Sequence, residues 1–269
     1  MTASHHRGRV LIVAGSDSGG GAGIQADIKA VSALGGYAAT AVTAITVQNT
    51  LGVTGIHAVP QTIIAEQMRA VLSDIGADVI KTGMLASRET IETVVGVLEE
   101  LARDIPLVVD PVMIATSGDA LVDEGTETVI RDQLVPRARL VTPNSDEAQR
   151  LTGIEITDLH TQIEAAKALR EMGAQAALVK GGHVDGASVR DVLVSQRGLE
   201  VMERPRIDTP HTHGTGCTLA SAIASLLAQG HSLPEAAEKA GDYLHEAIKR
   251  APGFGAGHGP VDHMWVVRD

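Results

Sequence analysis

Short apolar runs alternate with longer stretches in which apolar residues recur at helical spacing, along almost the whole chain. The short runs predict strands over residues 10–14, 37–46, 55–59, 78–81, 107–110, 140–141, 176–180, 189–194 and 199–203. The longer stretches predict helices over residues 22–34, 60–75, 87–103, 123–134, from 144 onward, 161–172, 215–229 and 233–250. Strands that alternate with helices indicate an α/β fold, with a mostly parallel sheet and helices on both faces.

No long linker, composition shift or fixed-period repeat interrupts this alternation. We therefore expect a single domain over residues 1–269, with disorder at residues 1–8. The first residues include His5, His6 and Arg7 but no apolar leader segment. No segment approaches the ~18 uninterrupted apolar residues of a membrane helix, so we expect no contact with a membrane.

Composition narrows the class of protein. Aromatic residues are scarce, with one Trp, two Tyr and one Phe, so Ala, Val, Leu and Ile must build the core. The formal net charge of -11, from 22 basic and 33 acidic side chains, repels a phosphate backbone and argues against a nucleic-acid partner. The single cysteine, Cys217, excludes an intrachain disulfide and fits a reducing compartment, so we predict a cytoplasmic protein.

A glycine-rich segment follows the first predicted strand and leads into the first helix, over residues 15–27. Its glycines allow a ligand to approach the backbone closely. The segment is no P-loop, because it lacks the closing Gly-Lys-Ser/Thr, and residues 40–54 lack the acidic residue that would hold the ribose of a dinucleotide. A plain strand–helix turn remains an alternative, but such a turn needs no carboxylate like that of Asp17.

A second cluster, residues 211–218, precedes an Ala-rich helix. Gly214 and Gly216 free the backbone, so its N–H groups can converge on an anion such as a phosphoryl group in transfer. The helix dipole is expected to lower the pKa of the Cys217 thiol below its usual ~8.5. The alternatives are an inert buried cysteine and a zinc site with His211 and His213, for which no further ligand pair is present.

Polar residues also follow three other predicted strands, at Asp110, at residues 142–147 and at Lys180. The carboxyl ends of parallel strands share one edge of a sheet, where ligands gather. Magnesium needs few protein carboxylates, and a lysine can meet phosphate as a point charge. Asn144 alone has a simpler interpretation as a helix cap.

Together these motifs resemble the hydroxymethylpyrimidine/phosphomethylpyrimidine kinases of thiamine biosynthesis, in the ribokinase-like superfamily. The resemblance spans residues 10–262 and depends on residues 14–27, 48–50, 81–85, 212–218 and 255–260. Ribokinase and most pyridoxal kinases have Asp where this chain has Cys217. The resemblance implies a three-layer ribokinase-like sandwich.

The resemblance also implies a role for each site residue. Gln48 would hold the aminopyrimidine edge and Met84 would pack on the ring, in a substrate pocket formed by Gly15, Asp17, Ala22, Thr46, Gln48 and Met84. The catalytic turn would comprise Gly214, Thr215, Gly216 and Cys217. Lys180, Asn144 and Thr142 would serve the nucleotide, and Asp110 and Glu147 the magnesium ion. Thr46 departs from the aliphatic residue expected beside the ring, and this favours pyridoxal more than the usual pattern does.

The activity implied is ATP- and Mg²⁺-dependent phosphorylation of 4-amino-5-hydroxymethyl-2-methylpyrimidine to its monophosphate, and of the monophosphate to the diphosphate. Cys217 would act as a proton acceptor or as a positioning group. A homodimer is expected from the resemblance alone. The alternatives are a pyridoxal kinase of the same fold, a non-catalytic pyrimidine-binding sensor and an NAD-linked oxidoreductase, which the missing ribose acid disfavours.

Overall fold

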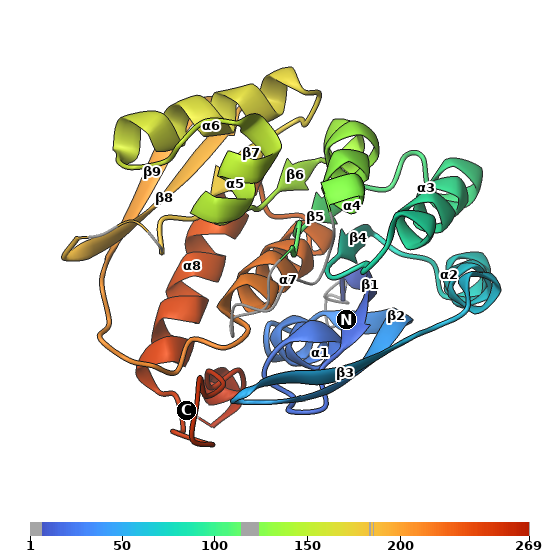
Figure 1. The fold of residues 1–269 in the computed structure, drawn as a ribbon, viewed down its shortest axis with the longest axis horizontal. Helices are drawn as coiled ribbons and strands as arrows, with labels where there is room; N and C mark the ends of the chain where they lie inside the picture. The colour runs from blue at the N-terminus through green and yellow to red at the C-terminus, as the bar shows by residue number, and fades with distance from the viewer. Residues whose placement is uncertain (1–6, 114–123, 183, 185, 269) are drawn as a thin grey trace, which may run out of the picture.

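One continuous sheet organises the computed structural model, with its strands in the order β3-β2-β1-β4-β5-β6-β7-β8-β9 (Figure 1). The structure describes residues 7–113, 124–182, 184 and 186–268. The strands are β1 (Arg9–Ser16), β2 (Tyr37–Asn49), β3 (Gly52–Ala58), β4 (Val79–Thr82), β5 (Leu107–Val109), β6 (Leu140–Val141), β7 (Ala177–Val179), β8 (Ser188–Ser195) and β9 (Gly198–Pro205).

Strands β1, β2, β4, β5, β6 and β7 run parallel to one another. Antiparallel strands complete the sheet on both sides, with β3 beside β2 and the β8–β9 hairpin beside β7. The mostly parallel sheet and the hairpin predicted from the sequence are therefore confirmed. The carboxyl ends of the parallel strands lie along one edge, as the placement of the polar residues requires.

The helices follow the predicted order. They are α1 (Gly23–Ala33), α2 (Gln61–Asp74), α3 (Arg88–Leu101), α4 (Glu124–Val129), α5 (Ser145–Thr152), α6 (Leu159–Glu171), α7 (Thr215–Ala228) and α8 (Leu233–Lys249). The helix predicted over residues 123–134 is confirmed as helical from Glu124 to Leu134, but its second half is a π-helical turn, Ile130–Leu134, and a short 3₁₀ turn, Val135–Arg137, follows it. Pro136 has no N–H to donate, so a regular α-helix cannot continue through it.

Side chains cap two of the helices, and the cap predicted at Asn144 is confirmed. The hydroxyl of Ser87 accepts from Thr90 N at 3.3 Å, at the start of α3. At the start of α5, Asn144 Oδ1 accepts from Glu147 N at 2.9 Å, and Glu147 Oε2 accepts from Asn144 N at 2.8 Å. This reciprocal pair is a capping box, which satisfies two helix-end donors at once.

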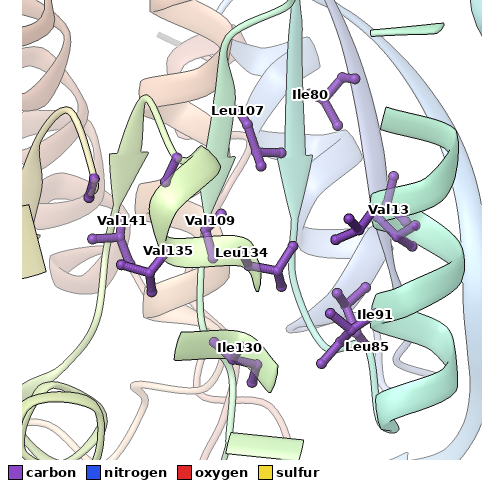
Figure 2. Packing of buried hydrophobic residues seen from close by; sticks show 14 of the residues in the cluster. Val13, Ile80, Leu85, Ile91, Leu107, Val109, Ile130, Leu134, Val135 and Val141 are labelled. Carbon is purple, nitrogen blue, oxygen red and sulfur yellow. The ribbon is translucent and has the colours of Figure 1, made fainter. Parts of the chain in front are cut away.

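Helices cover both faces of the sheet and enclose two apolar cores. On β1, Leu11 and Val13 belong to the core beneath α2, α3 and α6, whereas Val10 and Ile12 belong to the core beneath α1, α7 and α8. Successive strand residues point to opposite faces, so a strand covered on both faces must be apolar throughout. Figure 2 shows part of the first core, with side chains from β1, β4, β5 and β6 meeting those of α3 and the π-helical turn.

The segment after residue 46 is longer and more regular than predicted. Strand β2 continues to Asn49 and pairs with β3 from Gly52 onward, so residues 47–54 form the end of a hairpin. Apolar and polar residues still alternate there, at the period of a strand. The polar residues Gln48, Asn49 and Thr50 concealed that alternation by resembling a loop.

Two further expectations concern the chain start and membranes. Residues 1–6 lie outside the described residues, whereas Gly8 O accepts from Tyr37 N at 2.9 Å. Disorder therefore does not extend over the whole predicted range of residues 1–8. Across the described ranges, no helix combines the length and the apolar character needed to cross a bilayer.

Candidate active site

A cavity of about 630 Å³ opens at the carboxyl ends of the parallel strands. Every predicted site residue except Thr142 lines it. These residues are Gly15, Asp17, Ala22, Thr46, Gln48, Met84, Asp110, Asn144, Glu147, Lys180, Gly214, Thr215, Gly216 and Cys217. The structure therefore brings together residues that lie up to about two hundred positions apart in the chain.

Asp17 organises the glycine loop between β1 and α1. Its buried carboxylate accepts from the backbone N–H groups of Gly19 at 2.7 Å, Gly21 at 3.0 Å and Ala22 at 2.8 Å. It also lies 2.9 Å from Nε2 of His213. Burial alone would raise the pKa of Asp17, but the hydrogen bonds from His213 and the loop amides hold it below its usual value. The carboxylate thus ties the loop to the segment before α7, and its predicted contact with substrate stays a prediction.

The turn before α7 is built for close backbone approach. Gly214 has φ +79°, and a Cβ there would lie 1.9 Å from Gly21 O, so only glycine fits. The N–H groups of Gly216 and Cys217, in the first turn of α7, donate to no acceptor among the described residues. Free N–H groups at a helix start suit an anion, as the sequence predicts for this turn.

The expectation for the Cys217 thiol is wrong in sign. The side chain is partly exposed to the cavity, but burial raises its pKa to about 12. Lys81 and a hydrogen bond from Gly23 favour the thiolate, whereas the carboxylates of Asp27 and Asp110 oppose it. The loss of hydration outweighs the helix dipole here, so the thiol is protonated at neutral pH.

Three charged side chains meet near the middle of the cavity. Lys180 Nζ lies 3.2 Å from Asp110 Oδ1 and 4.0 Å from Glu147 Oε2. Burial raises the pKa of Glu147 to about 7, against the attraction of Lys180. Thr142 is fully buried, with its hydroxyl 3.4 Å from Asp110 Oδ1, and it does not line the cavity. The structure therefore places Thr142 behind Asp110, where it supports that carboxylate, and gives no basis for the direct nucleotide contact predicted for it.

Asp110 and Glu147 meet the requirement for a magnesium site shared with a nucleotide. Asp110 Oδ2 is buried and has no hydrogen-bond partner within the described part of the chain. No group of three or more His, Cys, Asp or Glu side chains suited to a metal occurs there either. Magnesium is commonly held by one or two carboxylates together with phosphate oxygens, so two sparse carboxylates fit it and a closed protein cage is not needed.

Gln48, Thr46 and Met84 form one end of the cavity. The hydroxyl of Thr46 lies 2.8 Å from Ser16 O and 3.1 Å from the amide of Gln48. The methyl end of Met84 would lie 2.6 Å from a Cβ at position 15, so Gly15 leaves the room that this side chain occupies. An amide beside a flexible apolar thioether suits a polar heterocycle.

Two arginines line the other end of the cavity and were missed in the sequence. Arg206 donates to the backbone carbonyls of Gly182, Val184 and Gly186 at 2.6–2.8 Å, which fixes the loop after β7. Arg204 lies against Gly241 of α8, where a Cβ would approach the guanidinium to 2.5 Å. Both arginines lie at the C-terminal end of β9. They could not be recognised in the sequence, because only the folded sheet brings this end of the strand to the cavity.

A buried ion pair beneath the cavity was also missed. Lys81 Nζ lies 2.8 Å from Asp27 Oδ1, and both side chains are fully buried. A sequence signal for it exists, because Lys81 interrupts the apolar strand β4. A lysine inside a strand covered on both faces requires a buried counter-charge.

The comparisons with known proteins agree with this geometry. A family model described as phosphomethylpyrimidine kinase matches residues 17–262. The chain is 51% identical over 263 residues to the thiamine biosynthesis bifunctional protein ThiED of Geobacter sulfurreducens, covering 98% of this chain and 54% of that protein. It is 46% identical over 258 residues to a hydroxymethylpyrimidine/phosphomethylpyrimidine kinase of Streptomyces coelicolor, covering 96% of this chain and 95% of that one. The chain thus spans about half of the bifunctional relative and nearly all of the second.

Solved structures of two kinases are similar over most of the chain. The ADP complex of Bacillus subtilis pyridoxal kinase superposes with a TM-score of 0.90 at 34% identity, covering 97% of this chain and 99% of that one. A phosphomethylpyrimidine kinase from Clostridium difficile superposes with a TM-score of 0.80 at 39% identity, covering 90% of this chain and 99% of that one. The ribokinase-like fold predicted from the sequence is therefore confirmed.

Proposed function

Because the chain belongs to the phosphomethylpyrimidine kinase family, we propose that it phosphorylates 4-amino-5-hydroxymethyl-2-methylpyrimidine with ATP, in thiamine biosynthesis. The monophosphate would then accept a second phosphoryl group in the same site. Relatives named as kinases of both hydroxymethylpyrimidine and phosphomethylpyrimidine support this assignment.

The observation that carries the proposal is the continuity of the cavity. It runs from Gln48 and Met84, past the turn at Gly214–Cys217 and the charged side chains in the middle, to Arg204 and Arg206. A pyrimidine bound at the first end would direct its hydroxymethyl group toward the turn. A nucleotide bound at the other end would place its terminal phosphate there as well, and such positioning supplies much of the catalysis in phosphoryl transfer.

The chemical groups at the turn suit the stabilisation of negative charge better than the removal of a proton. The N–H groups of Gly216 and Cys217 are free to receive oxygens of the transferred group, and Lys180 adds a positive charge beside it. A thiol with a pKa of about 12 is a poor proton acceptor in the free protein. A loose transition state does not need early removal of the alcohol proton, so Cys217 acts mainly as a positioning group in this proposal.

Magnesium would be held by Asp110 and Glu147, whose sparse oxygens leave room for phosphate oxygens as further ligands. When bound, it would neutralise the charge of the nucleotide phosphates. Glu147 must lose its proton to serve as a ligand, and its raised pKa couples metal binding to pH.

Pyridoxal is the second candidate substrate. Pyridoxal kinases superpose on the chain with TM-scores up to 0.90, although their identity of 33–34% is below that of the curated pyrimidine kinases. An ADP-release assay with hydroxymethylpyrimidine, its phosphate and pyridoxal separates the two. We expect the pyrimidine to be turned over at least tenfold more efficiently than pyridoxal, and the reverse order would assign the chain to the second activity.

The assembly and location that we propose follow from the surface and the substrates. Exposed apolar side chains gather on the β2–β3 hairpin, at the edge of the sheet, where they are Ile45, Val47, Leu51 and Ile56. Edge strands with exposed apolar side chains favour pairing with another chain, and we assign this surface to a homodimer. Use of ATP and a single free thiol fit the cytoplasm.

A further inference from the structure

Helices α1 and α7 lie side by side on one face of the sheet and are joined by hydrogen bonds (Figure 1). Ser221 Oγ donates to Asp27 Oδ1 at 2.6 Å, and Ser225 Oγ donates to Val31 O at 3.3 Å. The second contact lies four residues, about one helical turn, beyond the first on both helices, and Gly23 and Cys217 lie one turn before the first. The two helices are therefore parallel, and both begin at the cavity.

Lys81 reaches this contact from β4. Its Nζ lies 2.8 Å from the same Asp27 oxygen that Ser221 contacts. Ser221 and Cys217 are four residues apart on α7 and share a face of it. The ammonium of Lys81 is thus fixed below the first turn of α7, about one turn from the thiol. A Cβ at Gly83 would lie 3.0 Å from Nζ, so the chain after β4 also closes over this group.

Stability alone does not account for a fully buried ion pair. Removing two charges from water is costly, and replacing such pairs by uncharged groups is often neutral or stabilising. Here Asp27 Oδ2 has no hydrogen-bond partner within the described ranges, so the pair is not fully satisfied. The charges near Lys81 are those of Asp27 and Asp110, with Cys217 as the nearby ionisable thiol. Two of these three groups line the cavity.

The contacts of the pair favour its charged form. Burial alone would lower the pKa of Lys81, but Asp27, Cys217 and Asp110 raise it above its ordinary value. Burial raises the pKa of Asp27, while Lys81 and Ser221 act in the opposite direction. The 2.8 Å contact and the Ser221 hydrogen bond favour the ionised form of both groups.

We propose that Lys81 is a positioning residue of the phosphate-transfer site, whose fixed ammonium beneath the start of α7 stabilises negative charge that develops at the Gly214–Cys217 turn. Asp27 and Ser221 hold the ammonium in place. The proposal rests on the kinase activity proposed above. Asp27 offsets part of the field of this ammonium, because the two charges lie 2.8 Å apart. For the remaining field of the pair we expect roughly 10-fold in rate, at an effective dielectric constant of about 20.

The first variant removes both charges, so it leaves no buried charge behind. It is Lys81→Met combined with Asp27→Asn, which keeps an oxygen that can accept from Ser221. Lys81→Gln, the second variant, removes only the ammonium and keeps an amide that can donate to Asp27. The control is Arg9→Met combined with Asp78→Asn, which neutralises a pair joined at 2.7 Å at the opposite end of the sheet. We expect kcat to fall roughly 10-fold in the first two proteins, with the KM for ATP within threefold, and no such fall in the control.

A second measurement needs no substrate. Cys217 is the only cysteine in the chain, so its alkylation by iodoacetamide reports on one thiol. Loss of the ammonium should slow alkylation several-fold between pH 8 and 9, because less thiolate is present. If folded variants of Lys81 keep both kcat and the alkylation rate within twofold of the wild type, the pair has only a structural role. Absence of pyrimidine turnover in the wild type, with slowed alkylation in the variants, would reject the proposed substrate and retain the role of Lys81.

Discussion

At the scale of single residues, the hydroxyl proton of Thr46 decides how the side-chain amide of Gln48 is oriented. Thr46 Oγ1 lies 2.8 Å from Ser16 O and 3.1 Å from Oε1 of Gln48, but a hydroxyl donates only one hydrogen bond. The Ser16 carbonyl can only accept, whereas the Gln48 amide can turn over. The hydroxyl therefore donates to Ser16, and the amide nitrogen of Gln48 belongs at Thr46. In this orientation the amide oxygen of Gln48 is available to accept a hydrogen bond from the exocyclic amine of the proposed aminopyrimidine substrate.

Thr46→Val should release this orientation. A single hydrogen bond is worth about 0.5–1.5 kcal/mol, so we expect the KM for the pyrimidine to rise roughly 3- to 10-fold while the KM for ATP stays unchanged. Thr46→Ser keeps the hydroxyl and should stay within twofold of the wild type. Steady-state kinetics with each substrate varied in turn measure both effects. An equal rise for the two substrates would contradict a role confined to Gln48.

Cys217→Ala should lower kcat roughly 100-fold and leave the melting temperature within a few degrees. The side chain lies at the transfer site, and misplacement of the reacting groups there costs about 100-fold. Its removal takes little apolar volume from the core, so the cost in stability is about 1 kcal/mol. Single-turnover kinetics and thermal unfolding provide the two measurements, and near-normal turnover would make Cys217 a packing residue.

A site residue could be predicted from the sequence where its own side chain and motif indicate its role. It could not where that role depends on hydrogen-bond partners or burial in the folded chain. Asp110 and Lys180 follow predicted strands, and Gln48 belongs to a motif of the family that the chain resembles. The structure places all three on one cavity. The role of Asp17 in holding its own loop depends on four donors that only the folded chain brings together. The sign of the Cys217 pKa shift was missed because burial and neighbouring carboxylates are tertiary properties.

At the scale of elements, the β2–β3 hairpin carries exposed apolar side chains at one edge of the sheet. Val47 is 62% exposed on β2, and β3 forms the edge of the sheet. Val47→Glu places a charge on this surface and should shift the proposed homodimer toward the monomer. Sedimentation or light scattering at micromolar concentration measures the shift. Leu199→Glu, on β9 at the opposite edge, is the matched control and should leave the assembly unchanged.

The elements themselves were largely predictable, because a strand buried on both faces has an unmistakable apolar run. Strand β1 and helix α7 needed no tertiary information. The end of the β2–β3 hairpin did, since its tip is held by the distant residues 255–258 against Thr50. The π-helical turn after α4 was not predictable either, since its residues keep an ordinary helical pattern.

At the scale of the whole molecule, the final segment of the chain is docked through a buried histidine. His263 Nε2 lies 3.0 Å from Thr218 Oγ1, and its backbone carbonyl accepts from Tyr243 OH at 2.6 Å. Burial lowers the pKa of His263 to about 4, so the folded protein keeps it neutral. The unfolded chain binds a proton below about pH 6.5, and stability is therefore lost as the pH falls from 6.5 toward 4.

We expect this loss to reach roughly 2 kcal/mol at pH 5, which lowers the melting temperature by about 4–8 °C relative to pH 7. His263→Gln cannot take up the proton and should flatten the dependence. His57→Gln, at an exposed position on β3, should not. Thermal unfolding between pH 4.5 and 7.5 gives the curves, and parallel slopes for all three proteins would exclude His263 as the source.

The contacts between α1 and α7 also have a consequence for how the protein is made. Asp27 and Ser221 are 194 residues apart, so at 5–20 residues per second a ribosome completes α7 roughly 10–40 s after α1. During that interval the nascent chain holds the glycine loop and Asp27 without the helix that covers them. Ala30 and Val31, buried in the finished core, then face water. The early half of the chain can form strands, but the site itself assembles only near the end of translation, and chaperones that shield apolar surface would act on α1 during that wait.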